Sequence, residues 1–298
     1  MSFRSRIRTD MTLNEYKTLV DTKLSEYFKA DDMPQAGLFE SMRYSLNAGG
    51  KRIRPILVLE FCRITGGDSE KALPAACAIE MLHTYSLIHD DLPCMDNDDF
   101  RRGKPTNHVV YGECTAVLAG DALQAEAFGT ILRSKLPAEA RAECARILAD
   151  AVGADGMCGG QFLDMIGENK KLTENELDEI NSRKTGALLI AACTMGVAAA
   201  GGSDKQLEAA AMFGAAIGAA FQIRDDMLDV ISTSEQLGKP IGSDVQEHKN
   251  TYMALYGPGR CMEIIQKLTQ NAKTALNSAF DDTAFLCELA DSMVTRLN

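Results

Sequence analysis

The 298-residue sequence predicts an all-α fold, on three observations. Apolar residues recur at helical steps of three and four in nearly every segment. No five-residue stretch alternates apolar and polar residues as a half-buried strand would. No Ser/Gly-rich linker, low-complexity tract or repeat of fixed period divides the chain, so we expect a single domain spanning residues 1–298.

The first expected helix shows the helical period clearly, in Leu13, Tyr16, Val20, Leu24 and Tyr27. Thr12 and Glu15 in front of it form the pattern of a capping box. Further helices are expected at roughly 37–48, 55–65, 72–91, 113–132, 138–152, 174–200, 205–235, 260–279 and 283–296, separated by GG, GP or proline-bearing turns.

Two Ala- and Gly-rich segments are expected in the interior. The longest apolar run, Ala187 to Gly202, is short for a membrane span and predicts a buried helix. In AAAMFGAAIGAAFQI, residues 209–223, small side chains would let helix axes approach closely. We therefore expect both segments to be interior helices.

Composition narrows the class of protein. Hydrophobic residues make up 46% and charged residues 24%, as in an ordinary soluble globular protein. The net charge of −11 argues against nucleic-acid binding through a bulk positive field. Nine scattered cysteines without a CxxC pair, and a basic start without an apolar h-region, favour a reducing, cytoplasmic location without stable membrane insertion.

The first chemically unusual segment is IHDDLPCMDNDDFRRGKPTNH, residues 88–108, with five aspartates within ten positions. Asp90, Asp91 and Asp96 form the pattern DDxxxxD. Pro93 cannot donate a backbone hydrogen bond, so we expect the helix to end or bulge there, which could bring Asp96 back toward Asp90.

A second acidic cluster, FQIRDDMLDV, holds Asp225, Asp226 and Asp229 as DDxxD. On a helix, Asp225 and Asp229 share one face and repel each other. Such a run is often only a solvated acidic face. Here each cluster follows a strongly apolar helical stretch, and oxygen ligands without paired His or Cys favour Mg²⁺ over Zn²⁺.

Basic residues gather in four patches: Lys51, Arg52 and Arg54; Arg101, Arg102 and Lys104; Arg183 and Lys184; and Lys239. Together with two Mg²⁺-type clusters, they indicate a site for phosphates. The GxxxxGK[ST] loop and the kinase signatures are absent. The apolar stretches behind the acids indicate that the rest of the ligand is apolar.

These motifs resemble those of trans-prenyltransferases of the farnesyl diphosphate synthase family, the polyprenyl synthetases. The motifs GGKRIRP, SLIHDDLPCMDNDDFRRGKPTNH, GGQFLD, KTG, FQIRDDMLD and LGKP occur in the family's order over nearly the whole chain. The resemblance implies a helical bundle around a central cavity, usually homodimeric, with the two aspartate clusters facing each other.

The resemblance also implies roles for individual residues. Three Mg²⁺ ions would bridge an allylic diphosphate, dimethylallyl or geranyl diphosphate, to Asp90, Asp91, Asp96, Asp225, Asp226 and Asp229. Isopentenyl diphosphate would be held by Lys51, Arg54, His83 and Arg102. The allylic diphosphate would be held by Arg101, Lys184 and Lys239. Thr185 and Gln222 would stabilise the allylic cation, and with Lys184 they form the expected catalytic set.

Several residues keep a second interpretation. His83 is either a phosphate ligand or a core histidine bonded to a carbonyl. Gln161 either lines the cavity or caps a helix. Asp121 is expected to bond to another helix, and Lys249 has an uncertain phosphate role because Met253 replaces the proline that the family often shows after Thr-Tyr.

The resemblance also implies that product length is set by the residues four and five positions before the first cluster, in this chain Ser86 and Tyr85. At a rise of about 1.5 Å per residue, Tyr85 lies about 7.5 Å from Asp90 along the helix. A Tyr85 ring acting as the floor of the cavity predicts farnesyl diphosphate as the product, with a geranylgeranyl diphosphate synthase as the alternative.

Other classes fit less well. A class I terpene cyclase would usually carry Asn, Ser or Thr and Glu in its second metal motif and an aromatic pocket, whereas this chain has no Trp. A phosphohydrolase built on His89-Asp90 would need further metal-binding histidines. A non-catalytic regulatory subunit of another synthase stays open, although both complete clusters argue against it.

Overall fold

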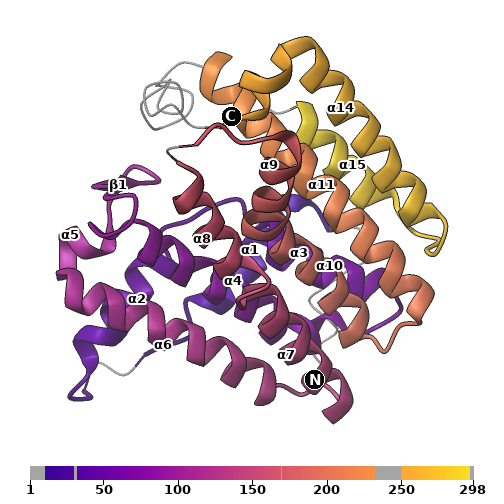
Figure 1. The fold of residues 1–298 in the computed structure, drawn as a ribbon. Coiled ribbons are helices and arrows are strands. Elements are labelled where there is room, and N and C mark those ends of the chain that lie inside the picture. The colour runs from indigo at the N-terminus through magenta and orange to yellow at the C-terminus, as the bar shows by residue number, and fades with distance from the viewer. Residues whose placement is uncertain (1–10, 30–31, 169, 232–249, 296–298) are drawn as a thin grey trace.

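The computed structural model describes residues 11–29, 32–168, 170–231 and 250–295, and helices make up most of them (Figure 1). The N-terminal half contains Leu13–Leu24 (α1), Ala36–Leu46 (α2), Ile53–Ile64 (α3), Ser69–Asp90 (α4), Asn107–Tyr111 (α5), Glu113–Leu132 (α6) and Ala138–Val152 (α7). The C-terminal half contains Met157–Gly167 (α8), Glu174–Asn181 (α9), Ala187–Ala199 (α10), Asp204–Ile231 (α11), Tyr252–Asn277 (α14) and Ala284–Thr295 (α15). The all-α prediction is confirmed.

Most of the expected helices are present, and α6 and α7 have the predicted bounds. The helices α5 and α8 were missed. The helix expected at 174–200 is divided by a π-helical turn, Ser182–Gly186 (η1). The helix expected from 260 begins earlier, at Tyr252. Gly257 (φ 69°) and Pro258 kink it, and these two residues led the sequence-based prediction to start the helix after them.

The described residues also contain a short antiparallel hairpin, Phe100–Arg101 (β1) with Lys104–Pro105 (β2), which the periodicity did not predict. Its turn requires left-handed backbone at Arg102 (φ 53°) and Gly103 (φ 73°). The hairpin directs the Arg101 and Arg102 side chains back toward the ends of α4 and α2, which positions part of the basic cluster described below.

The predicted capping box begins α1. The backbone N–H of Thr12 donates to Glu15 Oε2 (2.8 Å), and the Glu15 N–H donates to Thr12 Oγ1 (3.3 Å). These reciprocal bonds satisfy two backbone donors that a helix start otherwise leaves without partners.

The helix α10 lies in the interior and packs against α3, α7 and α11, so the prediction of a buried helix is confirmed. Glycines permit the close approach: a Cβ on Gly196 would lie 2.5 Å from the Val58 carbonyl, and one on Gly214 would lie 2.7 Å from Ile190 Cα. By length and composition, Asp204–Asp229 could also cross a membrane. In this fold the segment packs against α10 and α14.

A buried ion pair links the start of α3 to the middle of α4. The Arg52 guanidinium donates to Glu80 Oε1 (2.6 Å), and the two side chains are 1% and 3% exposed. Arg52 also donates to Asp21 on α1 (2.8 Å) and to the Leu46 carbonyl at the end of α2 (2.7 Å). This one side chain therefore ties together the helices that flank the GGKRIRP segment.

We expect Glu80→Ala to lower the free energy of unfolding by about 3–5 kcal/mol, because it leaves the Arg52 charge buried without its closest partner. Urea denaturation followed by circular dichroism measures the change. The control is Arg146→Ala on α7, whose ion pairs with Glu143 and Asp150 are exposed and contribute at most about 1 kcal/mol. Equal losses in the two variants would contradict the role of the buried pair.

Candidate active site

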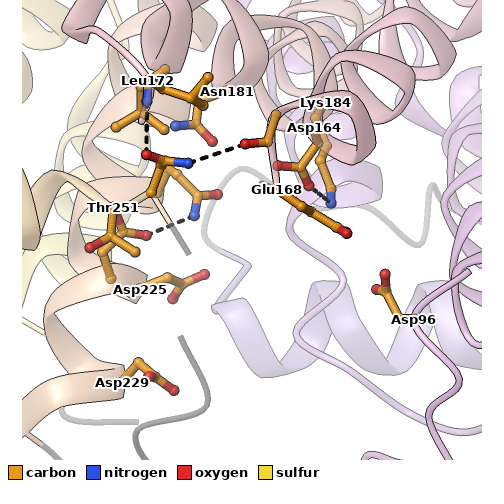
Figure 2. Close-up of a pocket in the computed structure, with 14 residues that line it drawn as sticks. Asp96, Asp164, Glu168, Leu172, Asn181, Lys184, Asp225, Asp229 and Thr251 are labelled. Carbon is orange, nitrogen blue, oxygen red and sulfur yellow. Dashed lines mark hydrogen bonds and ion pairs between the residues drawn. The ribbon is translucent and has the colours of Figure 1, made fainter. Parts of the chain in front are cut away.

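Carboxylates from both aspartate clusters line one cavity of about 320 Å³. Asp96 contributes from the loop after α4, and Asp225, Asp226 and Asp229 contribute from α11. Figure 2 shows Asp96 on one side of this cavity and Asp225 and Asp229 on the other. Residues far apart in the sequence thus place carboxylates around a shared space.

The first cluster folds back on itself as the sequence suggested. The helix α4 ends at Asp90, before Pro93. The Asp96 N–H donates to the Asp90 carbonyl (2.8 Å), and the Asn97 N–H donates to the Leu92 carbonyl (3.1 Å). Asn97 adopts a left-handed conformation (φ 54°), which Asn tolerates better than most residues. The predicted helix break and the return of Asp96 toward Asp90 are confirmed.

Burial raises the pKa of Asp90 and of Asp91 to about 6. The neighbouring charge of Asp96 contributes to the rise in both pKa values, whereas Lys184 acts to lower that of Asp90 and Arg101 acts to lower that of both. Ionising these carboxyls in their present surroundings therefore costs free energy, which a bound cation would offset.

The members of this cluster face different neighbours. Asp91 is 3% exposed and accepts the Arg101 Nε–H at 2.6 Å. Asp90 lines a second cavity, described below, while Asp96 lines the first. In this conformation Arg101 neutralises Asp91, so its guanidinium is directed at a carboxylate of the cluster rather than into the cavity between the clusters.

In the second cluster, Asp226 is held by hydrogen bonds on both oxygens. Gln222 Nε2 donates to Oδ1 (3.0 Å), and the backbone N–H of Tyr252 donates to Oδ2 (2.8 Å). Gln222 in turn accepts a hydrogen bond from Thr185 Oγ1 (3.2 Å). The predicted residues Thr185, Gln222 and Asp226 therefore form one connected chain from η1 to α11.

Lys184 lies on the π-helical turn η1, a kind of helix distortion that is frequent at functional sites. Its ammonium group donates to Asp164 Oδ2 on α8 at 2.6 Å, as Figure 2 shows. Sequence reasoning quoted Asp164 within GGQFLD without assigning it a role. The acidic residue three positions after Gln161 was the available signal.

A second cavity, of about 430 Å³, adjoins the first at Lys184, which lines both. Its walls include apolar and sulfur-bearing side chains: Leu87, Met95, Met157, Cys158, Phe162, Met165 and Leu188. Tyr85 and Ser86, the expected chain-length residues, line it, and so does Gln161. The carboxylate cavity thus continues into an apolar one.

Basic groups gather at the second cavity around His83. Burial holds the pKa of His83 well below its ordinary value, so the imidazole is neutral near pH 7. Four guanidinium groups lower this pKa further: those of Arg54, Arg102, Arg101 and Arg52. Such a concentration of positive charge is suited to an anion.

Arg54 and His83 both line the cavity, and buried Arg54 Nε has no hydrogen-bond partner. Arg102 donates to the Gly49 carbonyl, while the Lys51 side chain is exposed. Because buried polar groups are normally satisfied, the orphaned Nε–H points to a ligand acceptor at this position.

Two predicted basic residues, Lys239 and Lys249, lie outside the described residues. Most of the other predicted site residues line one or both cavities: Arg54, His83, Tyr85, Ser86, Asp90, Asp96, Lys184, Thr185, Gln222 and the second cluster. Neither cavity is lined by Lys51, Asp91, Arg101 or Arg102.

The carboxylates suit hard cations that share their coordination with an anion. In the described ranges no three His, Cys, Asp or Glu side chains come close enough to hold a metal ion by themselves. The donors are oxygens from opposite walls of one cavity, and Mg²⁺ is typically bound by a few carboxylates plus substrate phosphates.

Comparison with known proteins agrees with this site. The polyprenyl synthetase family model matches residues 35–283. A farnesyl diphosphate synthase of Geobacillus stearothermophilus is 46% identical over 96% of this chain and 98% of its own. A geranylgeranyl diphosphate synthase of Cyanophora paradoxa is 48% identical over 88% of each chain.

Solved structures of related enzymes have the same fold. The apo crystal structure of an FPP/GFPP synthase from Zymomonas mobilis superposes with a TM-score of 0.85, at 34% identity, over 95% of this chain and 97% of the other. The family model matches most of the chain, and the relatives are similar in sequence over nearly its whole length. Together with the shared fold and the paired aspartate clusters, this shows that the chain belongs to the polyprenyl synthetase family.

Proposed function

We propose that the protein condenses isopentenyl diphosphate head to tail with dimethylallyl diphosphate and then with geranyl diphosphate, giving farnesyl diphosphate. The observation that carries this proposal is the junction at Lys184, where a cavity lined by carboxylates continues into an apolar cavity lined by Tyr85. Such a junction accommodates a diphosphate on one side and a short prenyl chain on the other.

Cations would occupy the carboxylate cavity. Asp90 and Asp96 on one side and the second cluster on the other would hold Mg²⁺, three ions by family resemblance, with Asp91 supporting the site through Arg101. Bound Mg²⁺ supplies Lewis-acid neutralisation of the diphosphate leaving group. Lys184 would bind the same diphosphate after leaving Asp164, with Lys239 as a further expected ligand.

The chain's own groups would stabilise the charge that develops on the allylic carbon. Thr185 and Gln222 present oxygens at the boundary between the cavities, and these neutral groups do not capture a carbocation as a stronger nucleophile would. Apolar walls such as Leu188 and Met157 would exclude water that could otherwise quench the cation. The released diphosphate would accept the proton lost after condensation.

Isopentenyl diphosphate would bind at the basic cluster without metal. Arg54 Nε–H would find its acceptor on a phosphate oxygen, and Arg102 and Lys51 would add positive charge nearby. Neutral His83 can donate one hydrogen bond to the same group. This favours the phosphate-ligand role of His83 over its role as a core histidine.

Tyr85 supports a farnesyl rather than a geranylgeranyl product. Its ring lines the apolar cavity and is 7% exposed, so it occupies space that a longer chain would need. The geranylgeranyl alternative depends on a roomier cavity, and relatives with both product names are similarly identical to this chain.

We propose that the protein acts as a homodimer in the cytoplasm. Apolar side chains are exposed on α5 and α6, namely Val109, Val110, Val117 and Leu118. Exposed apolar patches are typical of protein–protein contacts.

Light scattering of the purified protein should give twice the chain mass of 32.3 kDa. A monomer at micromolar concentration would refute the dimer. Cytoplasmic location and single-domain organisation stay predictions.

We expect Asp90→Ala to lower the rate of labelled isopentenyl diphosphate incorporation, with dimethylallyl diphosphate and Mg²⁺, by about 10²–10³-fold or more, because a charge-stabilising group is lost. The matched control is Asp281→Ala, an exposed aspartate distant in sequence from both clusters, which should keep the original rate. A near-normal rate in Asp90→Ala would refute the metal role.

Absence of condensation by the unaltered protein with every allylic starter would favour a cyclase or a regulatory subunit.

We expect Tyr85→Ala to shift the products from farnesyl toward geranylgeranyl diphosphate and longer chains, because the side chain that limits the cavity is removed. Chain-length chromatography of the radiolabelled products measures the shift. Thr274→Ala, which removes an exposed hydroxyl bonded to the Gln270 carbonyl on α14 and lines neither cavity, is the control. An unchanged product profile in Tyr85→Ala would show that the floor lies elsewhere.

A further inference from the structure

The Tyr85 ring is contacted by residues of two helices, α4 and α8. On α4, His89 lies one turn after Tyr85, and the two rings meet edge to face with centroids 5.3 Å apart and planes at 89°. On α8, Cys158 Sγ lies 3.2 Å from the Tyr85 hydroxyl oxygen. The ring is therefore contacted both at its side and at its tip.

His89 is itself fixed by α6. Its Nε2 lies 3.1 Å from the Val117 carbonyl, which accepts the hydrogen bond. The imidazole also lies against Gly120, where an added Cβ would come within 2.2 Å of Nε2 and 2.5 Å of Cδ2. Glycine in a helix interior is less favourable than alanine, and here the space for His89 provides a packing reason for it.

We propose that Gly120, His89 and Cys158 are specificity-determining positioning residues, which set the product length by fixing the Tyr85 ring between α6 and α8. This inference rests on the proposed function. Gly120 leaves room for His89 beside α6, His89 supports the side of the Tyr85 ring, and Cys158 holds the hydroxyl at its tip. The floor of the apolar cavity is thus an assembly of three helices.

Substitutions of Gly120 and of Cys158 are expected to change the product length in opposite directions. In Gly120→Ala, the new methyl group would push the imidazole away from α6 toward Tyr85 and the cavity, which His89 already lines. The cavity becomes smaller, so the geranyl fraction should rise several-fold. In Cys158→Ala, the ring tip loses its contact and gains space, so the geranylgeranyl fraction should rise several-fold.

The test is the ratio of geranyl, farnesyl and geranylgeranyl products at fixed concentrations of isopentenyl and dimethylallyl diphosphate with Mg²⁺. Gly129→Ala is the matched control on α6, because its methyl group would meet only the end of the exposed Arg133 side chain. Cys158→Ser keeps a hydrogen-bonding group and should retain the original ratio. Both controls should leave farnesyl diphosphate as the main product.

A double variant separates positioning from general loosening of the fold. In His89→Ala the imidazole is absent, so adding Gly120→Ala should not change the product ratio further. A geranyl shift that persists in the double variant would overturn the proposed route through His89.

Unchanged ratios in both Gly120→Ala and Cys158→Ala, with condensation intact, would overturn the inference as a whole. If circular dichroism shows that Gly120→Ala is unfolded, Cys158→Ala decides alone. Absence of condensation by the unaltered protein would instead refute the proposed function.

Discussion

Repulsion among partly buried carboxylates is the constraint that the rest of the site accommodates. Burial disfavours the charged forms of Asp90 and Asp91, and the fold compensates some members of the two clusters from within. Arg101 pairs with Asp91, while Gln222 and the Tyr252 N–H hold Asp226. The carboxylates that line the cavities are where external positive charge would bring the greatest gain.

The same electrostatic contrast distinguishes the two cavities. Acidic groups line the first cavity, whereas guanidinium groups surround neutral His83 at the second. Under the proposed function, a diphosphate carrying Mg²⁺ would suit the first region, and a diphosphate without metal would suit the second. The apolar walls of the second cavity would keep a prenyl chain in a medium of low polarity, where charge separation is felt most strongly.

Much of the fold and site could be predicted, because helical period and charge clustering are local signals. Helix α7, the break at Pro93 and the Thr12 capping box followed from the sequence alone. The hairpin carrying Arg101 was missed because its two-residue strands are too short to alternate, and η1 was missed because a π-helical turn lies within a continuous apolar period. The contacts of Asp164, His89 and Gly120 depend on how helices pack, which no single segment encodes.

The π-helical turn has a consequence for how this site tolerates insertions and deletions. A π-helical turn is one residue wider than an α-helical turn, so Ser182–Gly186 behaves as a one-residue insertion within an otherwise regular helix. Deleting one residue there would restore the regular winding and leave the helices on either side in register, but it would remove the widened turn that carries Lys184 and Thr185. Deleting one residue from the regular part of α10 would instead rotate the two sides of the helix by about 100° relative to each other. The local chain length at this turn is therefore as restrictive as its side chains.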